Sequence, residues 1–163
     1  MDETPTVTAA LDDVERAYKE QSEKLWRSLL LFSGDPEVES DAVAEAFAQV
    51  LRRGTAIRDV DRWVWTAAFR IARGELKRRR AHESLSSDVA DAVPADVPTE
   101  TVDLIRALTQ LSPKQRGSVV LHHYAGYSNK ETAAILDTTA AAVGVHVERG
   151  RRRLRILLGD DDE

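Results

Sequence analysis

The stretch SPKQRGSVVLHHYAGYSNKETAAILDTTAAAVGVHVERGRRRLRILL, residues 112–158, decides the fold because it contains closely spaced signals for helix starts. Ser112 supplies an N-cap hydroxyl, and Pro113 suits the first helical position, where its missing N–H is not needed. Gln115 adds the amide of a capping box. These residues predict a helix from residue 113 to about residue 124.

A second helix start follows at once. Gly126 can end the first helix, because glycine tolerates the left-handed conformation of a helix C-cap. Ser128 and Glu131 then form another capping box. The pattern predicts a short helix over residues 129–136.

Thr139 closes the next turn and is the N-cap of a third predicted helix, which runs from residue 140 towards residue 158. Apolar residues recur along this helix at helical spacing, and Gly150 allows a close approach along this apolar side. The apolar side consists of Val143, Val147, Leu154 and Leu158. A short helix, a tight turn and a long helix form the helix-turn-helix arrangement that reads DNA.

The opposite side of this third helix is strongly basic. It carries His146, Arg149, Arg151, Arg152, Arg153 and Arg155. Residues 140–158 have a formal charge of +4, although the whole chain has −5. A merely solvated helix face would normally mix lysine, glutamate and arginine. The excess of arginine therefore favours DNA, because phosphate neutralisation dominates protein affinity for nucleic acid.

The composition excludes several classes of protein. The 163 residues include no cysteine, which rules out disulfides, iron–sulfur clusters and thiol nucleophiles. No apolar run reaches the ~18 residues that span a bilayer, and the acidic N-terminal residues are unlike a secretory signal. We expect a cytoplasmic protein without membrane insertion, built as one medium domain or two small ones.

The sequence also argues against an enzyme. Histidines 82, 122, 123 and 146 lack metal-ligand spacing, and the chain contains neither a phosphate-binding glycine loop nor a nucleophile elbow. We expect no catalytic residues, no metal and no cofactor.

Charge alternates along the chain. Residues 1–51 carry −8, residues 52–80 carry +7, residues 81–110 carry −5 and residues 138–158 carry +4. Two basic blocks separated by acidic stretches predict two separate contacts with a polyanion.

The N-terminal residues first predict two helices. Apolar spacing indicates one over residues 11–31, and Asp35 with Pro36 starts another that runs to about residue 53. The second helix carries a polar row at i, i+4 spacing, formed by Glu37, Asp41, Glu45 and Gln49. Such a row is either a solvated face or a surface that docks on a basic protein.

The next predicted helix runs from residue 60 or 61 to residue 80 and has a broad apolar face. Its other face carries Trp63, Thr66, Arg70, Arg73, Lys77 and Arg80. Basic side chains there would follow phosphates, and an exposed tryptophan can stack on an unpaired base. The alternative for Trp63 is a packing residue beneath a long arginine stem.

The fold class that follows is all-α, with two small helical domains joined by a flexible acidic linker. The linker is residues 81–100, which are rich in serine, proline and acidic residues. It separates a domain of residues 1–80 from a domain of residues 101–163 that opens with a helix to about residue 111 and contains the helix-turn-helix.

Three segments, in this order, resemble bacterial RNA polymerase sigma factors of the small extracytoplasmic-function (ECF) type. They are GDPEVESDAVAEAFAQVLRR at 34–53, RWVWTAAFRIARGELKRRR at 62–80 and LTQLSPKQRGSVVLHHYAGYSNKETAAILDTTAAAVGVHVERGRRRL at 108–154. The resemblance implies a polymerase-binding helix, a helix that grips and melts the −10 promoter element, and a domain that reads the −35 element. It implies no covalent chemistry by this chain.

The helix faces and the resemblance together give candidate residues for each surface. Those for polymerase binding are Asp41, Glu45, Phe47 and Gln49. Those for the −10 element are Arg58, Arg62, Trp63, Thr66, Arg70, Arg73 and Lys77. Those for the −35 element are Thr139, Ala142, Val145, His146, Arg149, Arg152 and Arg153.

The partners implied are core RNA polymerase, double-stranded promoter DNA, the melted non-template strand and an anti-sigma factor that would hold the protein inactive. The competing interpretation is a stand-alone helix-turn-helix regulator that acts without polymerase. That interpretation leaves the acidic row of residues 37–49 and the basic face around Trp63 unexplained.

Overall fold

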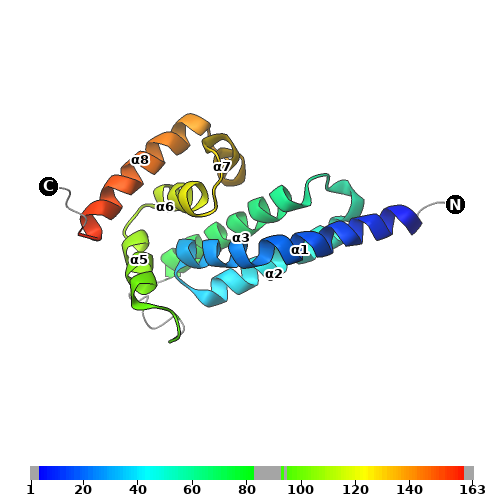
Figure 1. Ribbon diagram of the computed structural model, residues 1–163, viewed down its shortest axis with the longest axis horizontal. Helices are drawn as coiled ribbons and strands as arrows, with labels where there is room; N and C mark the ends of the chain where they lie inside the picture. The colour runs from blue at the N-terminus through cyan, green and yellow to red at the C-terminus, as the bar shows by residue number, and fades with distance from the viewer. Residues whose placement is uncertain (1–3, 83–92, 94, 160–163) are drawn as a thin grey trace.

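The computed structural model describes residues 4–82, 93 and 95–159, and these residues form helices and connecting turns without a β-strand. Figure 1 shows the helices, which are α1 (Thr4–Ser33), α2 (Pro36–Arg53), α3 (Val60–His82), α5 (Thr99–Thr109), α6 (Pro113–Val119), α7 (Asn129–Leu136) and α8 (Ala140–Leu157). A 3-10 turn, η1 (Gly54–Ala56), follows α2, and a π-helical turn, η2 (Val120–Tyr124), follows α6. The all-α class predicted from the sequence is confirmed.

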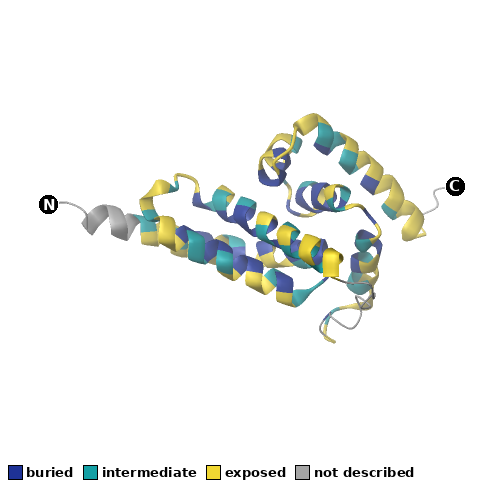
Figure 2. Ribbon diagram, turned by 180° about the vertical axis from the view of Figure 1, so that it is seen from behind, coloured by how far each residue is buried: buried dark blue, intermediate teal, exposed yellow. Residues whose placement is uncertain are grey.

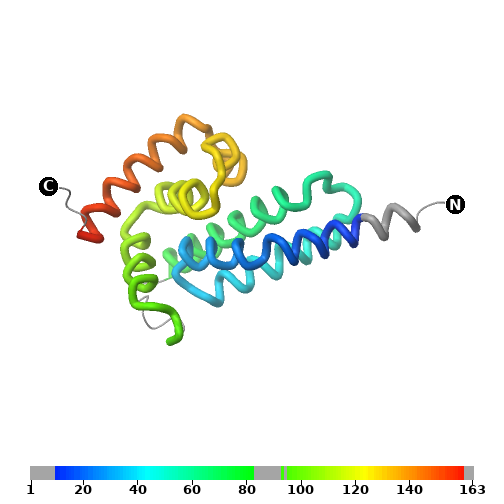
Figure 3. The backbone as a smooth tube through the Cα atoms, viewed as in Figure 1, coloured from blue at the N-terminus to red at the C-terminus, as the bar shows by residue number. Residues whose placement is uncertain are grey.

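Helices α1, α2 and α3 lie side by side as a three-helix bundle, as the tube in Figure 3 shows. The turn between α1 and α2 is set by Gly34, whose φ is +69°, and by Asp35, whose side chain accepts a 2.9 Å hydrogen bond from the Glu37 N–H. Phe32 of α1 and Phe69 of α3 meet inside the bundle with ring centroids 5.3 Å apart. Burial of these aromatic side chains, together with the aliphatic residues around them, stabilises the bundle.

The predicted helix starts of the C-terminal half are confirmed. The Ser112 hydroxyl accepts from the Gln115 N–H at 3.2 Å, and Ser128 and Glu131 form a reciprocal capping box with two 3.1 Å hydrogen bonds. The Thr139 hydroxyl accepts from the Ala142 N–H at 3.1 Å. Local side-chain to backbone bonds therefore fix all three starts.

The predicted helix of residues 113–124 differs in its second half. After Val119 the chain widens into a π turn, in which the Ala125 N–H bonds the Val120 carbonyl at 3.0 Å. Gly126, with φ +82°, ends the segment as predicted.

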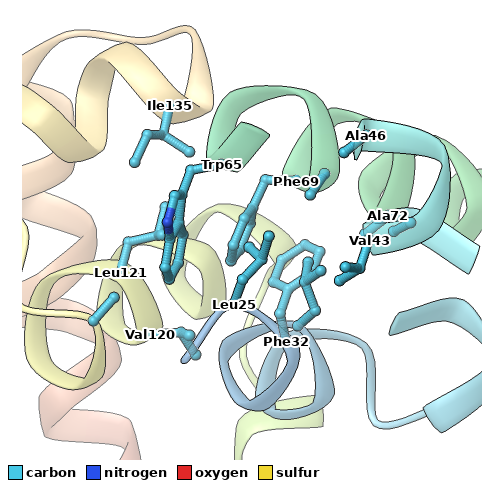
Figure 4. Close-up of a cluster of buried hydrophobic side chains, with 14 of the residues drawn as sticks. Leu25, Phe32, Val43, Ala46, Trp65, Phe69, Ala72, Val120, Leu121 and Ile135 are labelled. Atoms are coloured by element: carbon cyan, nitrogen blue, oxygen red, sulfur yellow. The ribbon is translucent and has the colours of Figure 1, made fainter. Parts of the chain in front are cut away.

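The two halves of the chain share one hydrophobic core. Figure 4 shows Leu121 and Ile135 of the C-terminal half beside Trp65 and Phe69 of α3. Trp65 also meets Tyr127 edge-on, with ring centroids 5.1 Å apart. Figure 2 shows buried residues both in the bundle and in α6 and α7, and these belong to one cluster. We call this contact between the halves the seam.

Most of the predicted linker lies outside the described residues. Its described part makes contact with the protein, because Val93 is buried in the core and Val97 packs against it. The helix that follows starts at Thr99, two residues earlier than predicted. The division into two domains stays a prediction.

Candidate polymerase and nucleic-acid interfaces

The start of α3 and the loop before it enclose a pocket of about 340 Å³ that we call the Trp63 pocket. Five of the residues predicted for the −10 element line it, namely Arg58, Arg62, Trp63, Thr66 and Arg70. Asp59 orients the helix start, because its carboxylate accepts from the Arg62 N–H at 3.1 Å. The structure therefore brings these five predicted residues together on one surface.

Trp63 is partly packed and partly accessible. Its side chain is half-buried and packs against the core, yet it also lines the pocket. The Arg53 guanidinium lies over its ring, 5.4 Å from the centroid. Arg53 was not among the candidates, because it ends α2 and only the fold of the chain brings it over the Trp63 ring.

Arg73 and Lys77 lie on a different surface from the Trp63 pocket. Arg73 is half-buried in the seam, where its Nη1 donates to the Leu136 carbonyl at 2.9 Å. Burial, together with the nearby Arg70 charge, lowers the Arg73 pKa. Lys77 is exposed and lines the cleft between α3 and the C-terminal half. The single basic face predicted for α3 is therefore divided between two surfaces.

Apart from His146, the predicted −35 residues lie along one long side of α8 or at its N-cap. Val145, Arg149, Arg152 and Arg153 are exposed, Ala142 is half-buried, and exposed Thr139 is the N-cap. Arg152 is paired with Glu148 at 3.2 Å, whereas no hydrogen bond or ion pair joins Arg149 or Arg153 to another described residue. The exposed side of α8 from Val145 to Arg153, which we call the outer face of α8, is open to a duplex.

His146 differs from its neighbours on α8. It is half-buried, it lines the cleft beside α3, and its Nδ1 has no partner among the described residues. Burial, and then the charges of Lys114 and Arg149, lower its pKa. In this arrangement of the two halves, His146 faces the seam rather than the outer face of α8.

In the polar row on α2, which we call the acidic row, Asp41 is exposed and hydrogen bonds hold Glu45 in place. The Glu45 carboxylate accepts from Gln49 at 3.1 Å and from Arg52 at 2.8 Å, and these hydrogen bonds lower its pKa. Phe47 does not belong to this surface, because it is 7% exposed and meets Tyr18 edge-on with centroids 5.2 Å apart. An aromatic side chain at that position turns inward because burial is worth about 1.5–3 kcal/mol.

Arg116 is a buried charge that the sequence did not reveal. It is 4% exposed, and its guanidinium donates to the carbonyls of Leu108, Thr109, Leu111 and Phe32 at 2.9–3.4 Å. Burial lowers its pKa to about 10, with a smaller contribution from Arg80. No sequence pattern could have indicated this role, since the acceptors are backbone groups from two distant helix ends.

The described residues contain neither a metal-ligand cluster nor a membrane-spanning helix. Across 4–82, 93 and 95–159, no three histidine or acidic side chains gather as metal ligands. No helix within those ranges has the length and apolar content to cross a bilayer.

Comparison with known proteins identifies the chain's relatives. Residues 101–154 match the family described as Sigma-70, region 4. The RNA polymerase sigma-E factor of Streptomyces coelicolor is 30% identical over 88% of this chain and 84% of its own length. The ECF RNA polymerase sigma factor SigM of Mycobacterium tuberculosis is 30% identical over 92% and 78%. The match to the sigma factor CarQ of Myxococcus xanthus, at 33% identity, spans 60% of each chain.

Two solved structures share the fold. The sigma factor RpoE of Bartonella quintana, crystallised with the anti-sigma factor NepR, matches with a TM-score of 0.78 and 20% identity over 92% of this chain and 99% of that one. CnrH, solved with the cytosolic domain of CnrY, matches with a TM-score of 0.72 and 20% identity over 98% and 96%. Together with the relatives above, these matches show that the chain belongs to the ECF group of RNA polymerase sigma factors.

Proposed function

We propose that this sigma factor directs core RNA polymerase to promoters and reads them with two surfaces, the Trp63 pocket and the outer face of α8. The observation that carries the proposal is the Trp63 pocket. Four cationic side chains, Arg53, Arg58, Arg62 and Arg70, surround one accessible aromatic ring there. A stacking platform ringed by cations suits an unpaired base with its flanking phosphates.

The outer face of α8 would anchor the upstream duplex. Arg149 and Arg153 are exposed and unpaired among the described residues, so they can neutralise phosphates without first breaking an internal bond. Val145 is 47% exposed and can contact a thymine methyl group in the major groove. The domain division proposed from the sequence then has a functional meaning, since each half carries one of the two surfaces.

The acidic row on α2 would dock on core polymerase. Asp41 is exposed and Glu45 is held by Gln49 and Arg52, so the row presents a fixed negative surface. Phe47 would act indirectly, by packing α2 against α1. The proposal assigns no catalytic step to this chain. Because the protein would act together with RNA polymerase, we expect it in the cytoplasm.

The proposal is tested by transcription in vitro from fragmented genomic DNA, with core polymerase and RNA 5′-end mapping. We expect discrete new start sites, preceded by two motifs at fixed spacing, only when the protein is added. Asp41→Arg should reduce polymerase binding and these starts. Asp103→Arg makes the same charge change on the exposed side of α5 and should leave both unchanged.

Two results would count against this function. Start sites that are unaffected by adding the protein would contradict a promoter-specificity role. DNA binding by the pure protein without polymerase association would favour the stand-alone regulator, an interpretation that family membership does not favour.

An anti-sigma factor is a further partner that we propose. Both solved structures described above are complexes, with NepR and with CnrY respectively. The similarity of fold makes a comparable partner for this chain a reasonable target for affinity purification from its native cells. A purification that recovers polymerase but no second specific protein would contradict this part of the proposal.

A further inference from the structure

A cleft of about 580 Å³ lies between α3 and the C-terminal half, and none of the surfaces proposed above accounts for it. Its walls come from both halves of the chain, because α1 and α3 form one side and α6, α7 and α8 form the other. Its volume lies within the range of about 300–1,000 Å³ that is typical of small-molecule sites.

The walls of the cleft carry an excess of positive charge. Arg73, Lys77 and Arg80 follow one another at i, i+4 and i+7 on α3, and Lys114 faces them from α6. The one acidic residue that lines the cleft is Asp137. No carboxylate of the described residues forms an ion pair with Lys77, Arg80 or Lys114. Like charges gathered in this way favour an anion between them.

A buried hydroxyl group also lines the cleft. Ser118 is 0% exposed, and its Oγ has no hydrogen-bond partner among the described residues. A buried polar group without a partner costs roughly 1–3 kcal/mol, so nearly all such groups in proteins are satisfied. His146 Nδ1, on the same cleft, lacks a partner as well. Two unsatisfied groups beside uncompensated cations point to a polar ligand.

Apolar side chains line the cleft as well. They are Phe32, Leu76, Pro113 and Leu136. A cleft lined by both apolar side chains and cations suits a molecule that carries a ring and several negative charges. A DNA duplex does not fit, because its convex surface is too broad to enter a cleft of about 580 Å³.

We propose that this cleft binds a phosphorylated small molecule with an apolar ring, of the nucleoside polyphosphate class. The phosphates would lie among Lys77, Arg80 and Lys114, and Ser118 would hydrogen-bond to the part that reaches the interior. The ligand would touch both halves and would therefore stabilise their closed arrangement. This consequence rests on the proposed function, because the two surfaces that would read a promoter, the Trp63 pocket and the outer face of α8, lie on different halves.

Isothermal titration calorimetry of the full chain with ATP, GTP and tripolyphosphate tests the site directly. We expect one molecule of at least one nucleotide to bind per chain, and to bind more tightly than tripolyphosphate. Lys114→Ala and Arg80→Ala should each weaken binding about tenfold, as expected for loss of a charge-assisted hydrogen bond. Lys130→Ala removes an exposed lysine of α7 outside the cleft and should change nothing.

Ser118→Ala gives a second variant with a distinct result. Removing an unpartnered buried hydroxyl should leave the ligand-free protein as stable as before or more so, yet weaken nucleotide binding severalfold. Thermal unfolding with and without nucleotide measures both effects.

The proposal is overturned if neither nucleotide binds at millimolar concentration, or if Lys114→Ala and Arg80→Ala bind as well as the native protein. If tripolyphosphate bound as tightly as the nucleotides, the proposed contact between the cleft and an apolar ring would be wrong. These experiments use no polymerase or DNA, so their failure is separate from a failure of the transcription assay.

Discussion

Arginine is prominent in two regions of this protein, the seam between the halves and the outer face of α8. Its side chains are bonded to backbone carbonyls in the first region and, among the described residues, free of such bonds in the second. In the seam, Arg116 and Arg73 donate to backbone carbonyls and have lost much of their solvent. On the outer face, Arg149 and Arg153 are exposed and bond to no other described residue.

The difference shows that residue type does not decide what a basic side chain does. A guanidinium whose N–H groups are taken by carbonyls cannot also neutralise a phosphate without breaking those bonds. An exposed guanidinium keeps all five donors for a ligand. An arginine that lies beside backbone carbonyls has a structural role, whereas an arginine without such neighbours is available to DNA.

The largest expected effect comes from Arg116→Leu. Four carbonyls would lose a charged donor in a buried place, so we expect a loss of about 3–5 kcal/mol in the free energy of unfolding, measured by urea denaturation. Arg149→Leu on the outer face should change it by less than about 0.5 kcal/mol. Equal effects from the two variants would contradict the assignment of Arg116 as a structural arginine and Arg149 as one that does not contribute to stability.

The inner side of α8 offers a test that involves no arginine. A Cβ added at Gly150 would lie 2.6 Å from Val119 Cγ2, so Gly150→Ala should destabilise the protein by about 1–3 kcal/mol. Gly144→Ala is the matched control, since its Cβ would meet Asn129 Nδ2 at an ordinary 3.5 Å. It should stabilise α8 by up to about 1 kcal/mol in the same thermal or urea unfolding experiment. A stabilising Gly150→Ala would show that α6 and α8 are not closely packed.

Arg70 and Arg73, three residues apart on α3, test whether the seam or the sequence pattern decides a role. Arg73→Met should lower the unfolding free energy by about 1–2 kcal/mol, because the Leu136 carbonyl loses its charged donor. Arg70→Met should leave stability unchanged and reduce promoter opening, followed by permanganate reactivity of thymines. The reverse outcome would place Arg70 in the structural group.

The smallest expected effects concern the outer face. Arg149→Ala and Arg153→Ala should each reduce the slope of log affinity against log salt by about 0.9 for duplex containing the upstream element. Fluorescence anisotropy over a salt series measures that slope. Arg155→Ala, an exposed change outside the predicted −35 set, is the control. An unchanged slope in both test variants would remove the outer face from DNA binding.

Local chemistry explains why much of the fold was predictable. The caps at Ser112, Ser128 and Thr139 form within four residues of sequence, so each appears in the structure as predicted. The cluster around Trp63 was predictable for a related reason. Most of its members lie close together on the first turns of α3, where helical spacing alone brings them near each other.

Other features depend on segments that are distant in the sequence. A helical wheel gives the angle of Arg73 about α3 but not the presence of Leu136 beside it, 63 residues later. Phe47 lies on the apolar side of the helix with the acidic row, and only the structure shows that it packs against Tyr18 on α1. Arg116 reaches the Phe32 carbonyl across 84 residues.

The helices and their starts could be predicted from the sequence, because hydrogen bonds within a few residues and the 3.6-residue period fix them, and the two basic blocks follow directly from the order of charged residues. The tertiary structure alone decided which cations are buried in the seam, which line the cleft and which face solvent. Those outcomes depend on which helix ends and backbone carbonyls from distant parts of the chain lie beside each cation. Residue spacing along the sequence does not predict these neighbours.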